Sequence, residues 1–321
     1  MSPEATAPTT IKVGVSQCLL GAKVRFDGGH KRDLYLVDTL GRFFEFVPIC
    51  PEVEIGLGIP REPVNLRRSD AGVRMVKHSG EDVTDRMLSW SEKAAERLGD
   101  EDLCGFIFKK SSPSCGLFRV KVYDKNDVPA KDGRGLFAAA MAERWPRLPM
   151  EEEGRLADAK LRENFIERIF AYRRLKDAFR GRWAAAGIVA FHTAHKYQLL
   201  AHSPEAYKSL GSLTAAIKGS DRKDFESRYA STFMDAMAKQ ATPGRHQNVL
   251  KHMAGYFKKQ LAASEKEELG QTFADFKSGL IPLIVPITLV RHYVRKFEVA
   301  YLAGQTYLQP HPKELMLRNH V

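Results

Sequence analysis

Three cysteines occupy equivalent places in the sequence, each after a short run of β-forming residues. Cys18 follows the run Ile11–Val15, Cys50 follows Phe43–Ile49, and Cys115 follows Gly105–Phe108. In an open parallel sheet, the loops at the carboxyl ends of the strands converge on one crevice, where ligands bind. Three thiolates form a soft donor set that suits an iron–sulfur cluster or zinc. Since no C-x-x-C pair is present, unrelated buried cysteines are the alternative interpretation.

Two further side chains beside these cysteines could carry acid–base chemistry. Glu52 lies two residues after Cys50, and Ser112 lies three residues before Cys115. A carboxylate near a metal can move protons, and a hydroxyl group can orient a substrate or a water molecule. A surface glutamate and a turn serine are the ordinary alternatives. The fourth cysteine, Cys104, begins an apolar run, and we predict that it is a buried structural residue.

The elements around the cysteines alternate between strand and helix patterns. A fourth strand is predicted over Phe118–Tyr123, and helices are predicted over Val83–Leu98 and Gly135–Trp145, the latter ending before Pro146. Such alternation is typical of a three-layer α/β domain. We therefore expect residues 11–150 to form an α/β domain with an open, largely parallel, Rossmann-like sheet.

The remainder of the chain shows helical periodicity and no convincing strand. A long helix is predicted over 155–180, and further helices over 185–201, 204–217, 222–240, 244–261, 265–278 and 283–302, separated by Pro and Gly turn signals. This pattern predicts an all-α helical bundle. The expected organisation is a disordered tail at 1–10, the α/β domain at 11–150, a linker helix at 151–182, and an all-helical domain at 183–321. The Pro149–Gly154 stretch, with its three glutamates, marks the predicted boundary.

Composition limits the class of protein and its surroundings. The 321 residues are 44% hydrophobic, which is enough for packed cores and excludes wholesale disorder. Four cysteines are too few for a disulfide scaffold and indicate a reducing, cytoplasmic setting. The most apolar run, Leu280–Val290, contains two prolines and is about half the ~20 residues that a membrane span needs. We expect no membrane domain.

Positive charge is concentrated in the second half. Residues 1–150 contain 23 basic and 21 acidic side chains, whereas residues 151–321 contain 27 and 18. Cations that neutralise phosphates, interleaved with tyrosines, are what RNA binding needs, and a solvated helix face is the alternative interpretation. The candidate RNA-binding residues are Arg245, His246, Lys251, His252, Lys258, Lys259, Arg291 and Arg295, with Tyr256, Tyr293 and Tyr301 between them. His192 and His195, one turn apart, are expected to pack in the core rather than bind zinc.

Three motifs in order resemble the thiouracil desulfidase (TudS-type) family over residues 11–150. They are Ser16-Gln17-Cys18-Leu19-Leu20-Gly21 with Arg25-Phe26-Asp27-Gly28, then Cys50-Pro51-Glu52-Val53, then Lys110-Ser111-Ser112-Pro113-Ser114-Cys115-Gly116. The resemblance implies a 4Fe–4S cluster held by Cys18, Cys50 and Cys115, with one iron left open for the sulfur of a thiolated pyrimidine. It also implies that Glu52 and Ser112 are the catalytic pair, in a reaction that replaces C=S by C=O without net redox change.

Residues 190–315 resemble an all-helical domain that is often fused behind this desulfidase module. Tandem proteins of this kind resemble bacterial desulfidases that convert 4-thiouridine in tRNA to uridine, so thiolated tRNA is the expected partner. Two alternatives stay open. One is a desulfidase for free thiopyrimidines or their nucleotides, such as 2-thiouracil or thiouridine monophosphate. The other is a non-catalytic iron–sulfur RNA-binding regulator. The sequence does not indicate the oligomeric state.

Overall fold

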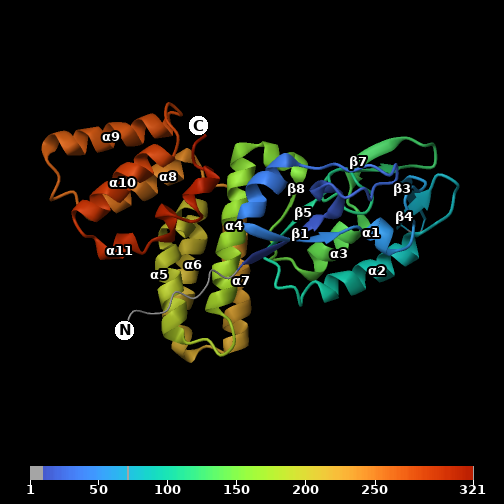
Figure 1. Ribbon diagram of the computed structural model, residues 1–321. Helices are drawn as coiled ribbons and strands as arrows, with labels where there is room; N and C mark the ends of the chain where they lie inside the picture. The colour runs from blue at the N-terminus through green and yellow to red at the C-terminus, as the bar shows by residue number, and fades with distance from the viewer. Residues whose placement is uncertain (1–9, 71, 321) are drawn as a thin grey trace. The chain divides into compact units, whose positions relative to one another are not determined.

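A four-stranded parallel sheet, sheet A, organises the first part of the chain (Figure 1). Its strands, in spatial order, are β2 (Phe44–Ile49), β1 (Ile11–Ser16), β5 (Gly105–Phe108) and β8 (Met150–Glu152). All three pairings are parallel. The structure is a computed structural model that describes residues 10–70 and 72–320, and the chain divides into unit 1 and unit 2 after Ala157. The expected α/β fold followed by a helical region is confirmed.

The two central strands of sheet A, β1 and β5, are mostly apolar and are buried over most of their length. The side chains of Val13, Val15 and the run Phe106–Phe108 are fully buried. Gly14 lies under the ring of Phe106, and a Cβ atom at this position would come within 2.2 Å of that ring. From α3 (Leu136–Arg144), Phe137 packs edge-on against Phe106 and Phe108, with ring centroids 5.7 and 6.0 Å apart. The helix α3 therefore covers the sheet through an aromatic contact.

A second sheet, sheet B, was not predicted. It has the order β4-β3-β6-β7, with β3 (Val64–Ser69), β4 (Gly72–Lys77), β6 (Val120–Tyr123) and β7 (Pro129–Gly133). The predicted fourth strand, Phe118–Tyr123, is β6, and its expected place in the parallel sheet was wrong. In β6, Val120 and Val122 are buried while Lys121 is exposed, so the strand has one apolar face. Such a strand suits a sheet with one solvated side, and β6 pairs antiparallel with β7.

The three glutamates predicted to mark the domain boundary instead end sheet A. Glu151 and Glu152 belong to β8 and are each 6% exposed. Their charges have partners, since Glu151 accepts a hydrogen bond from Arg155 (2.7 Å), and Glu152 accepts two from backbone N–H groups. Paired carboxylates can be buried, which is why their polarity did not reveal a strand.

Unit 2 is helical throughout its described residues, 158–320. Its helices are α4 (Ala159–Ala178), α5 (Ala185–His202), α6 (Pro204–Ala215), α7 (Arg222–Ala238), α8 (Pro243–Ala254), α9 (Ala263–Lys277), α10 (Ile284–Lys296) and α11 (Ala300–Ala303). Asp158 caps α4 by accepting hydrogen bonds from the backbone of Lys160 and Leu161, both at 2.9 Å. The long helix therefore begins at Ala159 rather than at 155, and it is part of unit 2 rather than a separate linker.

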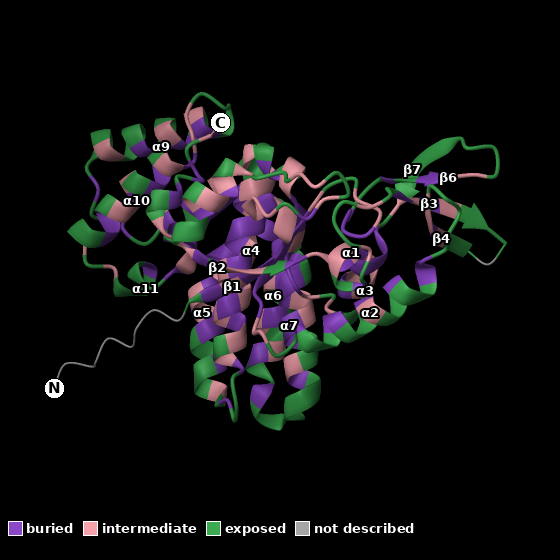
Figure 2. Cartoon of the chain, turned by 45° about the vertical axis from the view of Figure 1, so that its right-hand side comes forward, coloured by how far each residue is buried: buried purple, intermediate pink, exposed green. Residues whose placement is uncertain are grey.

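Two other predicted helices were too long. The one predicted over 244–261 ends at Ala254, and the one predicted over 283–302 is divided into α10 and α11. Figure 2, coloured by residue burial, shows buried and exposed residues alternating along the helices of unit 2, as in amphipathic helices. The predicted tail, residues 1–10, lies outside the described residues except for Thr10. Among the described helices, none has the length and apolarity to cross a membrane.

A buried network of charges joins the end of the chain to α4. Arg318, with 4% of its side chain exposed, lies 3.2 Å from Glu163 and 3.5 Å from Glu167. His320 lies 2.8 Å from Glu163, and His202 lies 3.6 Å from Glu167. The two carboxylates are thus compensated by cationic neighbours, which buried carboxylates require.

Candidate active site

A cavity of about 430 Å³ lies at the carboxyl edge of sheet A, and Cys18, Cys50 and Cys115 all line it. Cys18 lies two residues beyond β1, in the short 3-10 turn Gln17–Leu20. Cys50 directly follows β2 and precedes the one-turn helix α1 (Pro51–Glu54). Cys115 lies in the loop after β5. The structure therefore brings together the three cysteines that the sequence singled out, because their strands run parallel and end at one edge.

Hydrogen bonds fix the loop that carries Cys115. The Ser112 hydroxyl accepts from the backbone N–H of Cys115 (3.2 Å), and the Ser112 carbonyl accepts from Gly116 (2.7 Å). The backbone N–H groups of Leu136 and Phe137, in the first turn of α3, donate to the carbonyls of the same loop. This close approach leaves no room at Gly135, where a Cβ atom would come within 2.5 Å of the Ser114 backbone.

A chain of polar side chains connects the loops of Cys50 and Cys115. Ser114 donates from its hydroxyl to Oε1 of Glu52 (2.7 Å), and its Oγ lies 3.0 Å from that of Ser112. Arg61 holds the other carboxylate oxygen, Oε2, with its Nη2 at 2.6 Å and its Nε at 3.0 Å. Glu52 and Ser112, the predicted catalytic pair, therefore belong to one hydrogen-bonded chain with Ser114 between them.

Sequence reasoning did not identify Arg61 or Ser114 as site residues. Arg61 is fixed by the carbonyls of Val24 and Gly58, each at 3.0 Å, and only 4% of its side chain is exposed. It follows a Gly- and Pro-rich turn with no recognisable spacing from the cysteines. Ser114 directly precedes Cys115 within the third motif, so its position in that motif could have identified it as a site residue.

Burial makes the three thiols hard to ionise. It raises the pKa of the Cys18 thiol to about 11, and it also raises the pKa of Cys50 and Cys115. The other two cysteines add to the increase at Cys115, because three nearby negative charges would repel each other. A bound metal reverses this preference, since it stabilises thiolate ligands directly.

The cavity carries more cations than anions. Its lining includes the cationic side chains of Arg25, Lys31, Arg61, Lys109 and Lys110. Of these, Arg61 is paired with Glu52, Lys109 is paired with Glu153 at 2.5 Å, and Arg25 is paired with Asp27 at 3.4 Å. The remaining cations favour an anionic cluster or substrate in the cavity.

Cys104 lies away from the three cavity cysteines. It is fully buried and directly precedes β5, at the amino end of the strand, where its backbone N–H donates to Lys12 (2.8 Å). The prediction that Cys104 is buried is confirmed. The four cysteines, all in the described part of the chain, form no disulfide.

The candidate RNA-binding residues fall into two groups. Lys251, His252, Lys258, Lys259 and Arg295 are exposed. Arg245 donates to the His202 carbonyl (2.9 Å), and Arg291 donates to Gln309 (3.2 Å). His246 is hydrogen-bonded to Tyr307 (2.9 Å), and burial lowers its pKa to about 3, so it is neutral at pH 7. The exposed group alone can contact phosphates without breaking internal contacts.

Among the tyrosines and histidines singled out in this half, three lie in the core. Tyr293 is 4% exposed, whereas Tyr256 and Tyr301 are exposed. His192 and His195 are also buried, and burial lowers their pKa values to about 4 and 3. Their Nδ1 atoms are hydrogen-bonded to Tyr229 and to the Phe191 carbonyl.

Together, the parallel sheet and its cavity define an α/β module with three cysteines at the carboxyl edge of the sheet. Residues 13–153 match the family model described as 2-thiouracil desulfurase. The uncharacterized protein YbbK of Bacillus subtilis (strain 168) is 32% identical over 111 residues, which cover 32% of this chain and 71% of YbbK. The chain belongs to the 2-thiouracil desulfurase family.

Three further comparisons each match about half of the chain or less. Residues 196–312 match a family described as a protein of unknown function, DUF1722. The uncharacterized protein YbgA of Escherichia coli (strain K12) is 29% identical over 158 residues, 49% of this chain and 94% of YbgA. A solved structure of the 4Fe–4S-dependent thiouracil desulfidase TudS is 30% identical and covers 46% of this chain and 94% of its own, with a TM-score of 0.39.

Substitution of Gly135 tests how tightly the Cys115 loop is held. We expect Gly135→Ala to lower the free energy of unfolding by about 1–3 kcal/mol, because the added methyl group would displace the Ser114 backbone. Chemical unfolding followed by circular dichroism measures the change. Gly41→Ala is the matched control in unit 1, since its Cβ atom would meet neighbours at an ordinary 3.6 Å. Equal stability of the two variants would contradict the close contact.

Proposed function

We propose that this protein is a 4Fe–4S-dependent desulfidase that converts 4-thiouridine in tRNA to uridine. The observation that carries the proposal is the convergence of Cys18, Cys50 and Cys115 on one cavity that also contains the carboxylate of Glu52. Membership of the 2-thiouracil desulfurase family supports the reaction class. The products follow from the balance of atoms: water supplies the oxygen of C=O, and sulfide leaves.

The three cysteines suit a cluster better than a single metal ion. Within residues 10–70 and 72–320, no group of three or more His, Cys, Asp or Glu side chains is placed to bind one ion. The thiolates of Cys18, Cys50 and Cys115 would instead hold a four-iron cluster if one is bound. The cavity volume of about 430 Å³ and its surplus of cations also suit a bulky anionic cluster with a substrate beside it. We therefore assign Cys18, Cys50 and Cys115 as the cluster ligands.

When bound, a cluster with one iron not bound by protein sulfur supplies a Lewis acid for the thiocarbonyl sulfur. Glu52 provides the general base. Because Arg61 holds Oε2, Oε1 is the oxygen positioned to accept a proton from the water that attacks the ring carbon. Ser114 and Ser112 extend from Oε1 along the Cys115 loop, and they can pass that proton to the departing sulfur. Arg61 is a positioning residue, since it acts through Glu52.

The charge of the second half favours tRNA as the substrate. Residues 151–321 have nine more basic than acidic side chains, and four of the candidate Lys and Arg side chains are exposed. A free base would need no such surface, whereas a polyanion does. Free thiopyrimidines are the second candidate. The family description and the substrate named for TudS favour them.

Measuring desulfidation of thiolated tRNA and of free thiouracil by the reconstituted full-length protein distinguishes the two candidate substrates. We expect loss of 4-thiouridine absorbance from thiolated tRNA at a higher kcat/KM than loss of the thiocarbonyl band from free thiouracil. Replacing Lys258 and Lys259 together by Ala should raise KM for tRNA and leave turnover of thiouracil unchanged. Equal effects on both substrates would favour the free-base function. Cluster-dependent RNA binding without turnover of either substrate would instead favour a regulator.

Substitution of each cysteine tests the ligand assignment. Cys18→Ala, Cys50→Ala and Cys115→Ala should each lose iron and the visible absorbance of the cluster after anaerobic reconstitution, because each removes one of three ligands. Cys104→Ser should retain both, since Cys104 lies at the opposite end of β5. Iron analysis and absorption spectroscopy measure the outcome. A bleached Cys104→Ser variant that is still folded would contradict three-cysteine ligation.

Substitution of Glu52 tests the proposed base. Glu52→Gln should lower kcat by roughly 10²–10⁴-fold with full iron content, because the amide can still accept from Ser114 but cannot take a proton. Glu54→Gln, a neighbour in α1 outside the cavity lining, is the control and should keep full activity. Unchanged turnover by the iron-loaded Glu52→Gln variant would remove Glu52 from the mechanism.

A further inference from the structure

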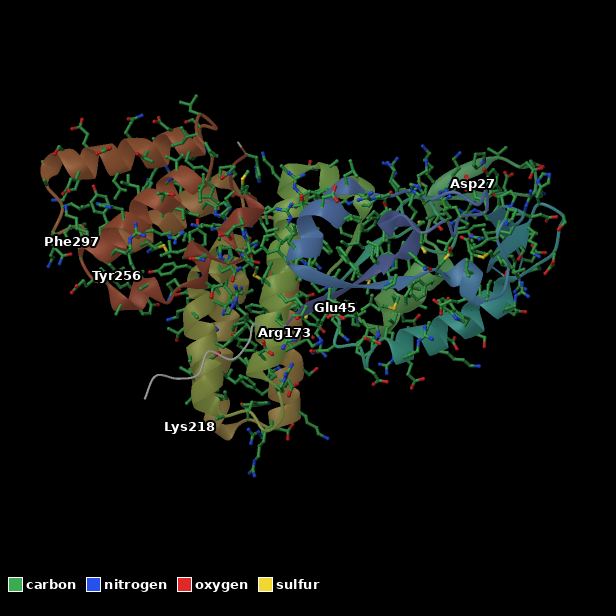
Figure 3. All side chains as sticks on the ribbon, in the orientation of Figure 1. Asp27, Glu45, Arg173, Lys218, Tyr256 and Phe297 are labelled. Atoms are coloured by element: carbon green, nitrogen blue, oxygen red, sulfur yellow. The ribbon has the colours of Figure 1, made fainter. Side chains whose placement is uncertain are left out.

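Two exposed tyrosines in unit 2 lie face to face. The rings of Tyr256 and Tyr301 have their centroids 5.4 Å apart and their planes at 17°. Tyr256 is 52% exposed and Tyr301 is 36% exposed, and among the described residues of unit 2 they are the exposed large aromatic side chains. They come from different segments, the turns after α8 and the short helix α11, and Figure 3 labels Tyr256 beside that helix. Their contact is therefore a product of the fold.

Neither tyrosine is needed to fill the core. Phe257, next to Tyr256, is fully buried and stacks on Tyr293 with centroids 5.5 Å apart. Leu302, next to Tyr301, is likewise fully buried. The neighbours thus supply the apolar packing, while the tyrosine rings remain accessible. Tyr197, 9% exposed, lies against Tyr256 and supports the pair from the interior.

The chain around Tyr256 is purely cationic. Between Ala236 and Ser264 there are five Lys and Arg residues and no Asp or Glu. Lys258 and Lys259 follow Tyr256 almost directly and are exposed. An aromatic surface beside uncompensated positive charge matches a single-stranded nucleic acid, whose bases stack on rings while its phosphates meet cations. A protein partner of apolar character would gain nothing from these lysines.

We propose that Tyr256 and Tyr301 form a stacking platform for an unpaired base of RNA. This inference rests on the proposed function, since it assigns the part of the RNA that unit 2 holds. The phenol rings bind the base through their faces, and Lys258 and Lys259 bind the adjoining phosphates. Because every base has a π face, the platform selects unpaired nucleotides over duplex rather than a particular sequence.

Equilibrium binding of a labelled 12-nucleotide oligouridylate to the full-length chain tests the platform. Tyr256→Ala and Tyr301→Ala should each raise Kd by about five- to 150-fold, the range expected for losing one base stack. Tyr256→Phe and Tyr301→Phe keep the rings and should restore wild-type Kd. Leu280→Ala, which removes a side chain that is 72% exposed elsewhere in unit 2, is the control and should not change Kd.

The salt dependence of Kd separates stacking from charge. Lys258→Ala should reduce the slope of log Kd against log salt by about 0.7, since one phosphate contact is lost. Tyr256→Ala should raise Kd equally at all salt concentrations and leave the slope unchanged. Binding that is unaffected by both tyrosine substitutions but weakened by Lys258→Ala would overturn the platform and leave the RNA function intact. Failure of the wild-type protein to bind either the oligonucleotide or tRNA would overturn both.

Discussion

The parallel pairing of β1 with β2 and with β5 is the constraint on which the site depends. Parallel strands end at the same edge of a sheet, so Cys18, Cys50 and the Cys115 loop must meet there, although 97 residues separate the first from the last. Burial raises the pKa of each thiol, so the three thiols stay protonated unless a bound metal stabilises the thiolates. The meeting of the three cysteines at one edge of sheet A thus follows from the parallel direction of its strands.

A second layer of contacts surrounds these three cysteines. The carboxylate of Glu52 is held from one side by Arg61 and from the other by Ser114, so each oxygen has a defined role. The Cys115 loop is in turn fixed by the first turn of α3, and Glu152 at the end of sheet A accepts from the backbone of Leu117 and Phe118 at 2.8 and 3.0 Å. Residues that look unremarkable in sequence therefore hold the reactive groups in place.

Sequence patterns predicted the features that depend on local periodicity and failed where tertiary pairing overrides it. Apolar runs identified β1, β2 and β5, and hence the place of the cysteines. The strand β8 was missed because its two glutamates are buried. Glu152 accepts hydrogen bonds from the distant backbone of Leu117 and Phe118, which no local pattern reveals. Arg61 was missed for the same reason. Among the tyrosines, spacing did not separate Tyr293, which is buried, from Tyr256 and Tyr301, which are exposed. That distinction arises only when the helices of unit 2 pack.

The central claim is that three cysteines hold a four-iron cluster and leave one iron to the substrate. Mössbauer spectroscopy of the protein reconstituted with ⁵⁷Fe, recorded with and without a thiolated pyrimidine, tests this most directly. Our account predicts that the signal of one iron in four changes when the thiocarbonyl compound is added, while the other three keep their parameters. Four irons that remain unaltered by the compound, or a site that binds a single iron, would contradict it.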